Sequence, residues 1–180
     1  LEPWLADHRL GADAVLPAAA MLDMALAACR ARHGDATALE VAEFRILRPV
    51  LLEHDAAREI RSTLEEDGAF RLESRRRLAE EPWSLHALGE VRPVAPAALS
   101  VAPLAVAGTV LDGAAIRDRA AQLGLTYRAA FAAVREVEAA GDRALVRLDL
   151  PEAAPADDGF ILHPSRLDGA LQGLFALLDP

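Results

Sequence analysis

The most informative stretch of this chain is residues 163–172, which read His163-Pro164-Ser165-Arg166-Leu167-Asp168-Gly169-Ala170-Leu171-Gln172. Proline is favoured in the first turn of a helix, so we expect an apolar helix over residues 164–178. Asp168 and Gln172 are four positions apart and would share one face of that helix. On that face the Gln172 amide can orient the Asp168 carboxyl group.

Asp168 has two interpretations. An aspartate near a helix start can simply complement the helix dipole. Apolar neighbours surround this one, however, and they are Leu167, Leu171, Leu174 and Phe175. A carboxyl group in such a setting resists ionisation and can act as an acid.

A second stretch, at the other end of the chain, carries a histidine. His8 lies in Trp4-Leu5-Ala6-Asp7-His8-Arg9-Leu10-Gly11, and Pro17 follows at the start of another apolar helix. A histidine in a loop before a helix is often only a partner for a backbone carbonyl. The apolar residues around His8 favour the neutral imidazole, which is the form that can act as a base. We therefore interpret the two stretches as one base and one acid that meet in a shared pocket.

Composition and charge narrow the possible partners. Of the 180 residues 53% are hydrophobic and only 4% are aromatic, so the core must be largely aliphatic. The net charge of -9 argues against a nucleic-acid partner. No apolar stretch predicts a membrane-spanning helix, and no spacing predicts a metal or nucleotide cofactor. The start of the chain has no signal-peptide pattern and Cys29 is the single cysteine, so we expect a cytoplasmic protein.

The pattern of apolar and turn residues predicts two similar halves. In the first half we expect a helix over residues 17–33 that ends at Gly34, and strands over residues 39–52, 58–64, 69–75 and 83–91, with a hairpin turn at residues 66–68. In the second half we expect a helix over residues 114–123, strands over residues 131–138 and 143–150 that meet at Gly141, and the helix over residues 164–178. The predicted halves are residues 1–93 and 104–180, joined by a proline-rich linker over residues 94–103. No strands follow the last helix, so the second half is expected to be incomplete.

Three segments resemble motifs of the dehydratase domains of modular polyketide synthases. Residues 8–17 resemble the family motif His-x-x-x-Gly-x-x-x-x-Pro, residues 124–131 resemble Gly-x-x-Tyr-Gly-Pro-x-Phe, and residues 163–172 resemble His-Pro-x-x-Leu-Asp-x-x-x-Gln. They occur in the family order and span essentially the whole chain. The third match is close, whereas the first two are partial. Ala12 replaces the glycine of the first motif, although Gly11 is adjacent, and Arg128 and Ala129 replace Gly-Pro in the second. These changes bear on substrate positioning more than on the acid and the base, and Ala129 is expected to loosen the turn after Tyr127.

The resemblance implies an α+β fold of the double hotdog type, in which two curled antiparallel sheets each wrap a long helix. It also implies a dehydratase that removes water from a 3-hydroxyacyl thioester and leaves a 2,3-enoyl thioester. The substrate would arrive on the phosphopantetheine arm of an acyl carrier protein, beside neighbouring synthase domains, and the protein would be a homodimer. No other cofactor is implied.

Elementary chemistry assigns roles to the residues of the three motifs. Removal of a proton next to a thioester needs a base, and a hydroxide leaving group needs an acid. His8 and Asp168 would supply these, with Gln172 orienting the acid. Tyr127 would bond to Asp168 or to the substrate hydroxyl, or else be only a tyrosine at a strand edge. Backbone N–H groups near Gly11, or at the helix start set by Pro17, would stabilise the developing oxyanion.

Two further functions stay open beside the dehydratase. One is a dehydratase-like domain that isomerises a double bond or closes an oxygen ring, and the other is a non-catalytic architectural module. The acid–base interpretation also predicts geometry. The His8 imidazole and the Asp168 carboxyl should approach to roughly 3 to 6 Å, in an apolar tunnel between the halves that Tyr127 borders.

Overall fold

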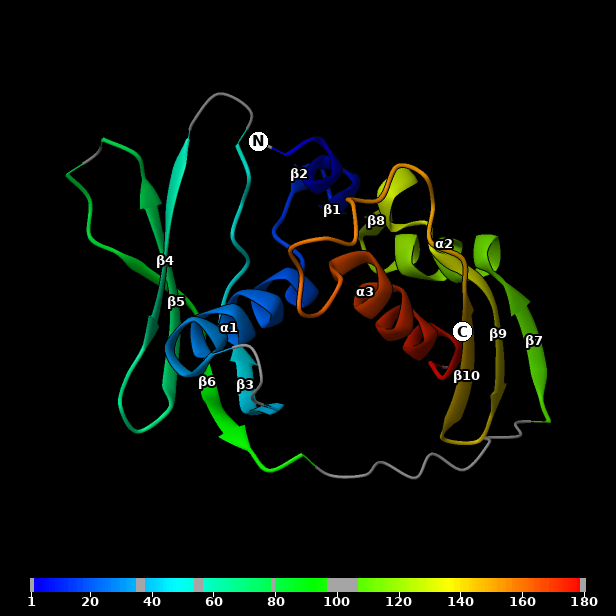
Figure 1. Cartoon of the computed structure of the whole chain (residues 1–180). Helices are drawn as coiled ribbons and strands as arrows, with labels where there is room; N and C mark the ends of the chain where they lie inside the picture. Colours follow the sequence, from blue (N-terminus) through cyan, green and yellow to red (C-terminus); the bar gives the residue numbers. More distant parts are fainter. Residues whose placement is uncertain (1, 35–37, 54–56, 79, 97–106, 179–180) are drawn as a thin grey trace.

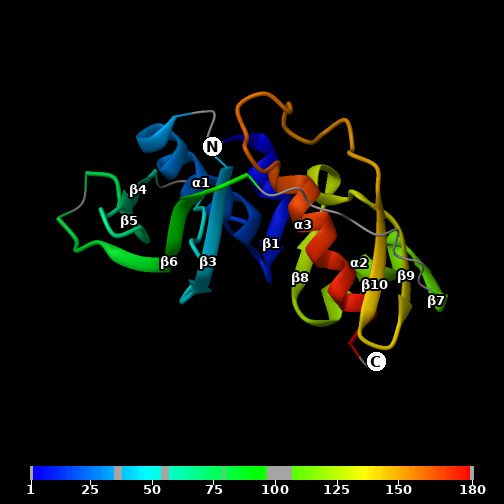
Figure 2. The same ribbon diagram turned by 60° about the horizontal axis from the view of Figure 1, so that its bottom comes forward.

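A computed structural model describes residues 2–34, 38–53, 57–78, 80–96 and 107–178 of the chain. Two larger antiparallel sheets stand apart, and helices α1 (Ala18–His33) and α3 (Pro164–Gln172) lie next to each other between them (Figures 1 and 2). A third, smaller sheet joins the start of the described chain to residues 125–127 in the second half. None of the described helices is both long enough and apolar enough to cross a membrane.

The first sheet has the strand order β3-β6-β5-β4 and packs against α1. Its strands are β3 (Ala38–Ile46), β4 (Arg58–Leu64), β5 (Ala69–Arg76) and β6 (Ser84–Val94). Helix α1 begins after Pro17 and ends at Gly34, whose φ of 89° lies in the left-handed region that glycine adopts without strain. Small and apolar residues of α1 pack into the first core with Phe70 and Leu72 of β5.

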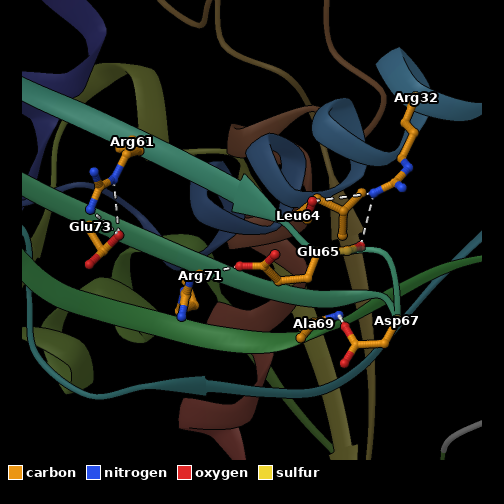
Figure 3. Close-up of polar contacts among 8 residues, drawn as sticks. All are labelled: Arg32, Arg61, Leu64, Glu65, Asp67, Ala69, Arg71 and Glu73. Carbon is orange, nitrogen blue, oxygen red and sulfur yellow. Dashed lines mark hydrogen bonds and ion pairs between the residues drawn. The ribbon is translucent and has the colours of Figure 1, made fainter.

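The tip of the β4–β5 hairpin fastens the end of α1. Arg32 donates to the backbone oxygens of Leu64 and Glu65 (Figure 3). At the turn Asp67 Oδ1 accepts from the N–H of Ala69, and Arg71 pairs with Glu65. Because these groups are largely exposed, each ion pair contributes little, and the contacts serve mainly to fix the direction of the hairpin.

The second sheet has the strand order β10-β9-β7, with β7 (Thr109–Asp112), β9 (Val134–Ala140) and β10 (Arg143–Leu148). Helices α2 (Gly113–Gln122) and α3 both contact it. Two glycines let α3 lie close to β10. A side chain at Gly169 would meet Leu148, and one at Gly173 would collide with Val146. This close approach sets the height at which Asp168 stands above the sheet.

The smallest sheet links residues far apart in the sequence. Strand β1 (His8–Leu10) pairs with β2 (Asp13–Ala14) on one side and with β8 (Leu125–Tyr127) on the other. In this register His8 lies opposite Tyr127. The start of the chain is therefore held to the second half through backbone hydrogen bonds.

The α+β architecture, α1, the hairpin 66–68, α2 and the Gly141 turn agree with the sequence prediction. Other boundaries were wrong. The strand expected to reach residue 52 ends at Ile46, and the strand expected to begin at Phe131 begins at Val134, because residues 129–131 form a 3₁₀ turn. The helix predicted over residues 164–178 is α-helical only to Gln172, and residues 173–176 continue as a 3₁₀ turn. Strands β1, β2, β7 and β8 were not predicted. Of the expected linker 94–103, residues 97–103 lie outside the described part of the chain, and Val94 is the last residue of β6.

Candidate active site

His8 and Asp168 are both buried and lie next to each other. His8 Nε2 is 3.4 Å from Asp168 Oδ1, which falls within the range expected from the sequence. His8 is 7% exposed and Asp168 is 5% exposed. His8 begins β1 and Asp168 lies in the middle of α3, so a strand and a helix from opposite ends of the chain deliver the two side chains.

Hydrogen bonds hold the Asp168 carboxyl group. Gln172 Nε2 donates to Asp168 Oδ2 over 2.9 Å and also to the backbone oxygen of Phe131 over 3.0 Å. Gln172 is 1% exposed, so its amide has a single orientation that satisfies both acceptors. Oδ2 is thereby turned toward Gln172, which leaves Oδ1 to face His8.

Aromatic rings hold the His8 imidazole. The rings of Tyr127 and Phe131 contact it in T-shaped arrangements, with ring centroids 5.4 and 5.3 Å away. Nδ1 of His8 is buried and has no hydrogen-bond partner among the described residues. Packing and the backbone of β1 therefore direct Nε2 toward Asp168.

Tyr127 lies beside the pair without a hydrogen bond to Asp168 in this structure. Its ring stands between His8 and Phe175, whose centroid is 6.3 Å away. Burial raises the pKa of Tyr127, and the negative charge of Asp168 raises it further. The phenol therefore stays neutral and can donate its O–H to a group that enters the site.

An apolar pocket of about 330 Å³ opens beside His8. The other residues that line it are Leu16, Ala18, Met21, Ile46, Leu47, Arg48 and Pro49. All of them belong to the first half of the chain. This pocket therefore does not lie between the two halves, where the sequence predicted an apolar tunnel. Among the described residues, neither Asp168 nor Tyr127 lines it. Backbone hydrogen bonds hold the segment after β3 in this wall. The N–H of Leu16 donates to the oxygen of Val50, and the N–H of Leu52 donates to the oxygen of Ala14.

The structure corrects the role expected for Gly11. Its N–H already donates to the backbone oxygen of Gly124 over 2.7 Å, so it is not free to bind an oxyanion. Gly11 instead makes the turn between β1 and β2, with a φ of 60°. Ala12 needs no positive φ, so its replacement of the motif glycine strains no backbone. Pro17 lies at the start of α1 as predicted, and its oxygen accepts from Met21.

Sequence reasoning missed two aspartates that fasten this site. Asp7 Oδ2 accepts from the N–H of Ala130 over 2.9 Å, and the Asp7 oxygen accepts from Arg128 over 2.8 Å. The turn after Tyr127, where the second motif departs, is therefore held by Asp7. Asp23 of α1 accepts from two N–H groups of the segment before α3. In the sequence, both appear as a single aspartate among apolar neighbours. The neighbouring residues do not indicate which distant backbone groups bond to them.

Comparisons with known proteins agree on one family. A family model described as a polyketide synthase dehydratase domain matches residues 1–80, and one described as a polyketide synthase dehydratase N-terminal domain matches residues 95–180. The chain is 37% identical over 195 residues to polyketide synthase ThaG of Burkholderia thailandensis. It is 34% identical over 190 residues to the mycoketide-CoA synthase of Mycobacterium tuberculosis. These alignments cover 99% and 100% of this chain but only 4% of each relative.

Solved structures show the same likeness. The dehydratase domain of a mycocerosic acid synthase-like polyketide synthase is 27% identical, with a TM-score of 0.78 over 97% of this chain and 62% of that one. A trans-AT polyketide synthase dehydratase domain from Brevibacillus brevis is 24% identical, with a TM-score of 0.80 over 95% of this chain and 68% of that one. The fold is accordingly the double hotdog, of which this chain spans a part.

Proposed function

Because this chain belongs to the family of polyketide synthase dehydratase domains, we propose that it removes water from a 3-hydroxyacyl thioester and leaves a 2,3-enoyl thioester. The observation that carries the proposal is the 3.4 Å contact between His8 Nε2 and Asp168 Oδ1. A buried imidazole and a buried carboxyl group at this spacing can act on adjacent carbon atoms of one substrate.

The two proposed roles balance as one elimination. His8 Nε2 takes the proton from the carbon next to the thioester carbonyl, and the electrons of that C–H bond form the double bond. Protonated Asp168 gives its proton to the hydroxyl on the next carbon, whose C–O bond breaks to release water. A proton that then passes from Nε2 to Oδ1 restores the starting pair. Both forms of the pair carry the same net charge, and burial penalises the form with separated charges.

Gln172 has a specific part in this scheme. Since its amide donates to Oδ2, that oxygen must be an acceptor. The carbonyl oxygen of a protonated carboxyl group is its better acceptor, so we place the proton of the acid on Oδ1, the oxygen nearest to His8. Gln172 thus selects the oxygen from which the proton is delivered.

We assign the oxyanion donors to the first turn of α1. Gly11 is excluded by its bond to Gly124, whereas the first N–H groups of a helix have no partner within the helix. Ala18, the first residue of α1, lines the pocket beside His8, and Pro17 provides no side-chain cap. A thioester oxygen seated there would be stabilised as negative charge develops on it.

The proposed partners follow from the family. An acyl carrier protein would present the substrate on its phosphopantetheine arm, neighbouring synthase domains would act before and after this one, and two copies would form a dimer. The pocket supports an acyl substrate, since its lining is apolar apart from His8 and Arg48 among the residues described.

One incubation tests the proposed reaction against its alternatives. The protein is mixed with a 3-hydroxyacyl pantetheine thioester, and the product is identified by mass and by its ultraviolet absorption. The expected product is lighter by one water and conjugated. If the 3-hydroxyacyl thioester stays unchanged in either hydroxyl configuration, a 2,3-enoyl thioester that carries a hydroxyl further along its chain is supplied instead. Loss of its conjugated absorption at unchanged mass would mean an isomerase or a cyclase, and no change in either substrate would mean an architectural module. The matching thioester without the hydroxyl is the control, because it has no leaving group.

A further inference from the structure

Helix α1 carries one buried carboxylate that the proposed reaction does not use. Asp23 is 8% exposed, and its neighbours on the buried face of α1 are Ala19, Ala20 and Leu26. A charged group in such a place is stable only when hydrogen bonds compensate for its burial. Asp23 Oδ1 obtains two of them, from the backbone N–H groups of Ile161 and Leu162, both at 2.8 Å.

The bonded segment leads directly into α3. His163 follows Leu162 and is the N-cap of α3, and its oxygen accepts from the N–H of Leu167. The side chains of Ile161 and Leu162 pack on the first core, with α1 and the first sheet. The Asp23 bonds therefore fasten the chain to the first half just before it enters the helix that carries Asp168.

Asp23 and the pocket beside His8 also share one rigid element. Ala18 and Met21 line that pocket from the same helix. A bond from α1 to residues 161–162 thus relates the start of α3 to the pocket wall and not only to its own sheet. Gly169 and Gly173 fix the distance of α3 from β10, but they do not fix its position relative to α1.

We propose that Asp23 is a positioning residue, which holds the start of α3 against α1 so that Asp168 Oδ1 stays in contact with His8 Nε2. The charge of Asp23 matters, because a carboxylate bonds to N–H groups about twice as strongly as a neutral acceptor does. The expected effect on turnover rests on the proposed dehydratase function. The expected effect on the contact between Asp168 and His8 does not.

The test compares Asp23→Ala and Asp23→Asn with Asp112→Ala. Asp112 is a matched control, because its Oδ1 accepts from one backbone N–H, that of Ala115, at the exposed start of α2. Three quantities are measured for each protein: kcat and KM for the 3-hydroxyacyl thioester, the exchange rates of the Ile161 and Leu162 amide hydrogens, and the NMR signals of the His8 ring.

For Asp23→Ala we expect kcat to fall by about 10- to 100-fold, because a misplacement near 1 Å costs up to about that much. KM should change by less than about twofold, since the apolar pocket wall is untouched. Both amides should exchange faster and the His8 ring signals should shift. Asp23→Asn keeps an acceptor of the same shape without the charge, so each change should be smaller and of the same sign. Asp112→Ala should leave all three quantities as they are in the unchanged protein.

Several outcomes would overturn the proposal. One is a folded Asp23→Ala protein whose His8 ring signals and kcat match the unchanged protein. Another is a rise in KM at constant kcat, which would mean that Asp23 only shapes the pocket. If Asp23→Ala does not fold, Asp23→Asn decides alone, and unaltered exchange and unaltered His8 signals in it would contradict the proposal. If the unchanged protein releases no water, the proposed function fails, while exchange and the His8 signals still test Asp23.

Discussion

Asp168 comes from the second half of the chain and His8 from the first, and the two side chains are held in different ways, although the groups that hold both belong to the second half. Asp168 is fixed by polar contacts, since Gln172 donates to its Oδ2 and also to the Phe131 oxygen. His8 is fixed by packing, since the rings of Tyr127 and Phe131 contact its ring and its Nδ1 has no hydrogen-bond partner among the described residues. The position of Asp168, the proposed acid, should therefore depend on the Gln172 amide. The position of His8, the proposed base, should depend on the volume of the rings packed against it.

The most severe test removes the base and keeps its shape. His8→Phe should fold normally, because Phe fills the place between Tyr127 and Phe131, yet turnover should fall by about 100- to 10,000-fold. The measurement is water release from the 3-hydroxyacyl thioester together with the melting temperature. His33→Phe, at the exposed end of α1, is the control. Turnover of His8→Phe within tenfold of the unchanged protein would remove His8 from the mechanism.

The polar support of the acid is tested by Gln172→Ala. Asp168 stays in place but loses the donor to Oδ2, so dehydration should slow by about 10- to 100-fold. Asp168→Asn should be the slower enzyme of the two, because an amide has no acidic proton to give. The comparison is made by kcat at saturating substrate. A larger loss in Gln172→Ala than in Asp168→Asn would reverse the roles assigned to these residues.

The packing support of the base is tested at Tyr127. Tyr127→Phe keeps the ring against His8 and removes only the hydroxyl, so we expect a loss of about two- to tenfold, below the range for a general acid or base. Tyr127→Ala removes the ring as well and should be the slower enzyme. If both variants lose activity equally, the hydroxyl rather than the ring is what matters, and the contrast between the two supports would be wrong.

The smallest effect concerns stability in the first half, where a second buried histidine supports the pocket wall. His86 Nε2 lies 2.8 Å from Ser74 Oγ, and the His86 oxygen accepts from Leu47. Burial lowers the pKa of His86 below its ordinary value, and the charges of Arg58 and Arg48 add to this, whereas its contact with the Arg48 oxygen opposes it. The unfolded chain therefore takes up a proton near pH 6.5, before the folded protein does.

It follows that stability should decrease as the pH falls below about 6.5, over the interval down to the lowered pKa of His86. Urea unfolding of the protein and of His86→Asn at several pH values measures this. The variant should be less stable near neutral pH, and its stability should depend less on pH. Equal slopes for the two proteins would show that His86 does not contribute to the pH dependence.

The parts of the fold that the sequence predicted are those set by local patterns. Helix α1 follows from Pro17, its apolar face and Gly34, and the β4–β5 hairpin follows from residues 66–68. The motif around Asp168 was recognisable because its spacing is that of a single helix. For the same reason, the hydrogen bond between Asp168 and Gln172 could be expected from the sequence alone.

The parts that the sequence did not predict depend on distant partners. Strands β1 and β8 have three residues each, too few for a periodic pattern, and their pairing joins segments that are far apart in the sequence. The apolar pattern of an α-helix continues after Gln172, but residues 173–176 form a 3₁₀ turn where Gly173 packs against Val146. Asp7 and Asp23 were visible as charges, while their partners lie more than a hundred residues away.

The pairing of β1 with β8 has a consequence during synthesis on the ribosome. The hydrogen bond from the Ala130 N–H to Asp7 can form only after Ala130 has been synthesised, 123 residues after Asp7. At about 5 to 20 residues per second, His8 emerges roughly 6 to 25 s before the strand that will cover it. During this interval the nascent chain can form α1 and the first sheet, but the residues that pack against His8 are still missing. The proposed site therefore forms only after both segments have been synthesised, and a chain that ends before residue 125 would contain the first sheet but could not complete the site.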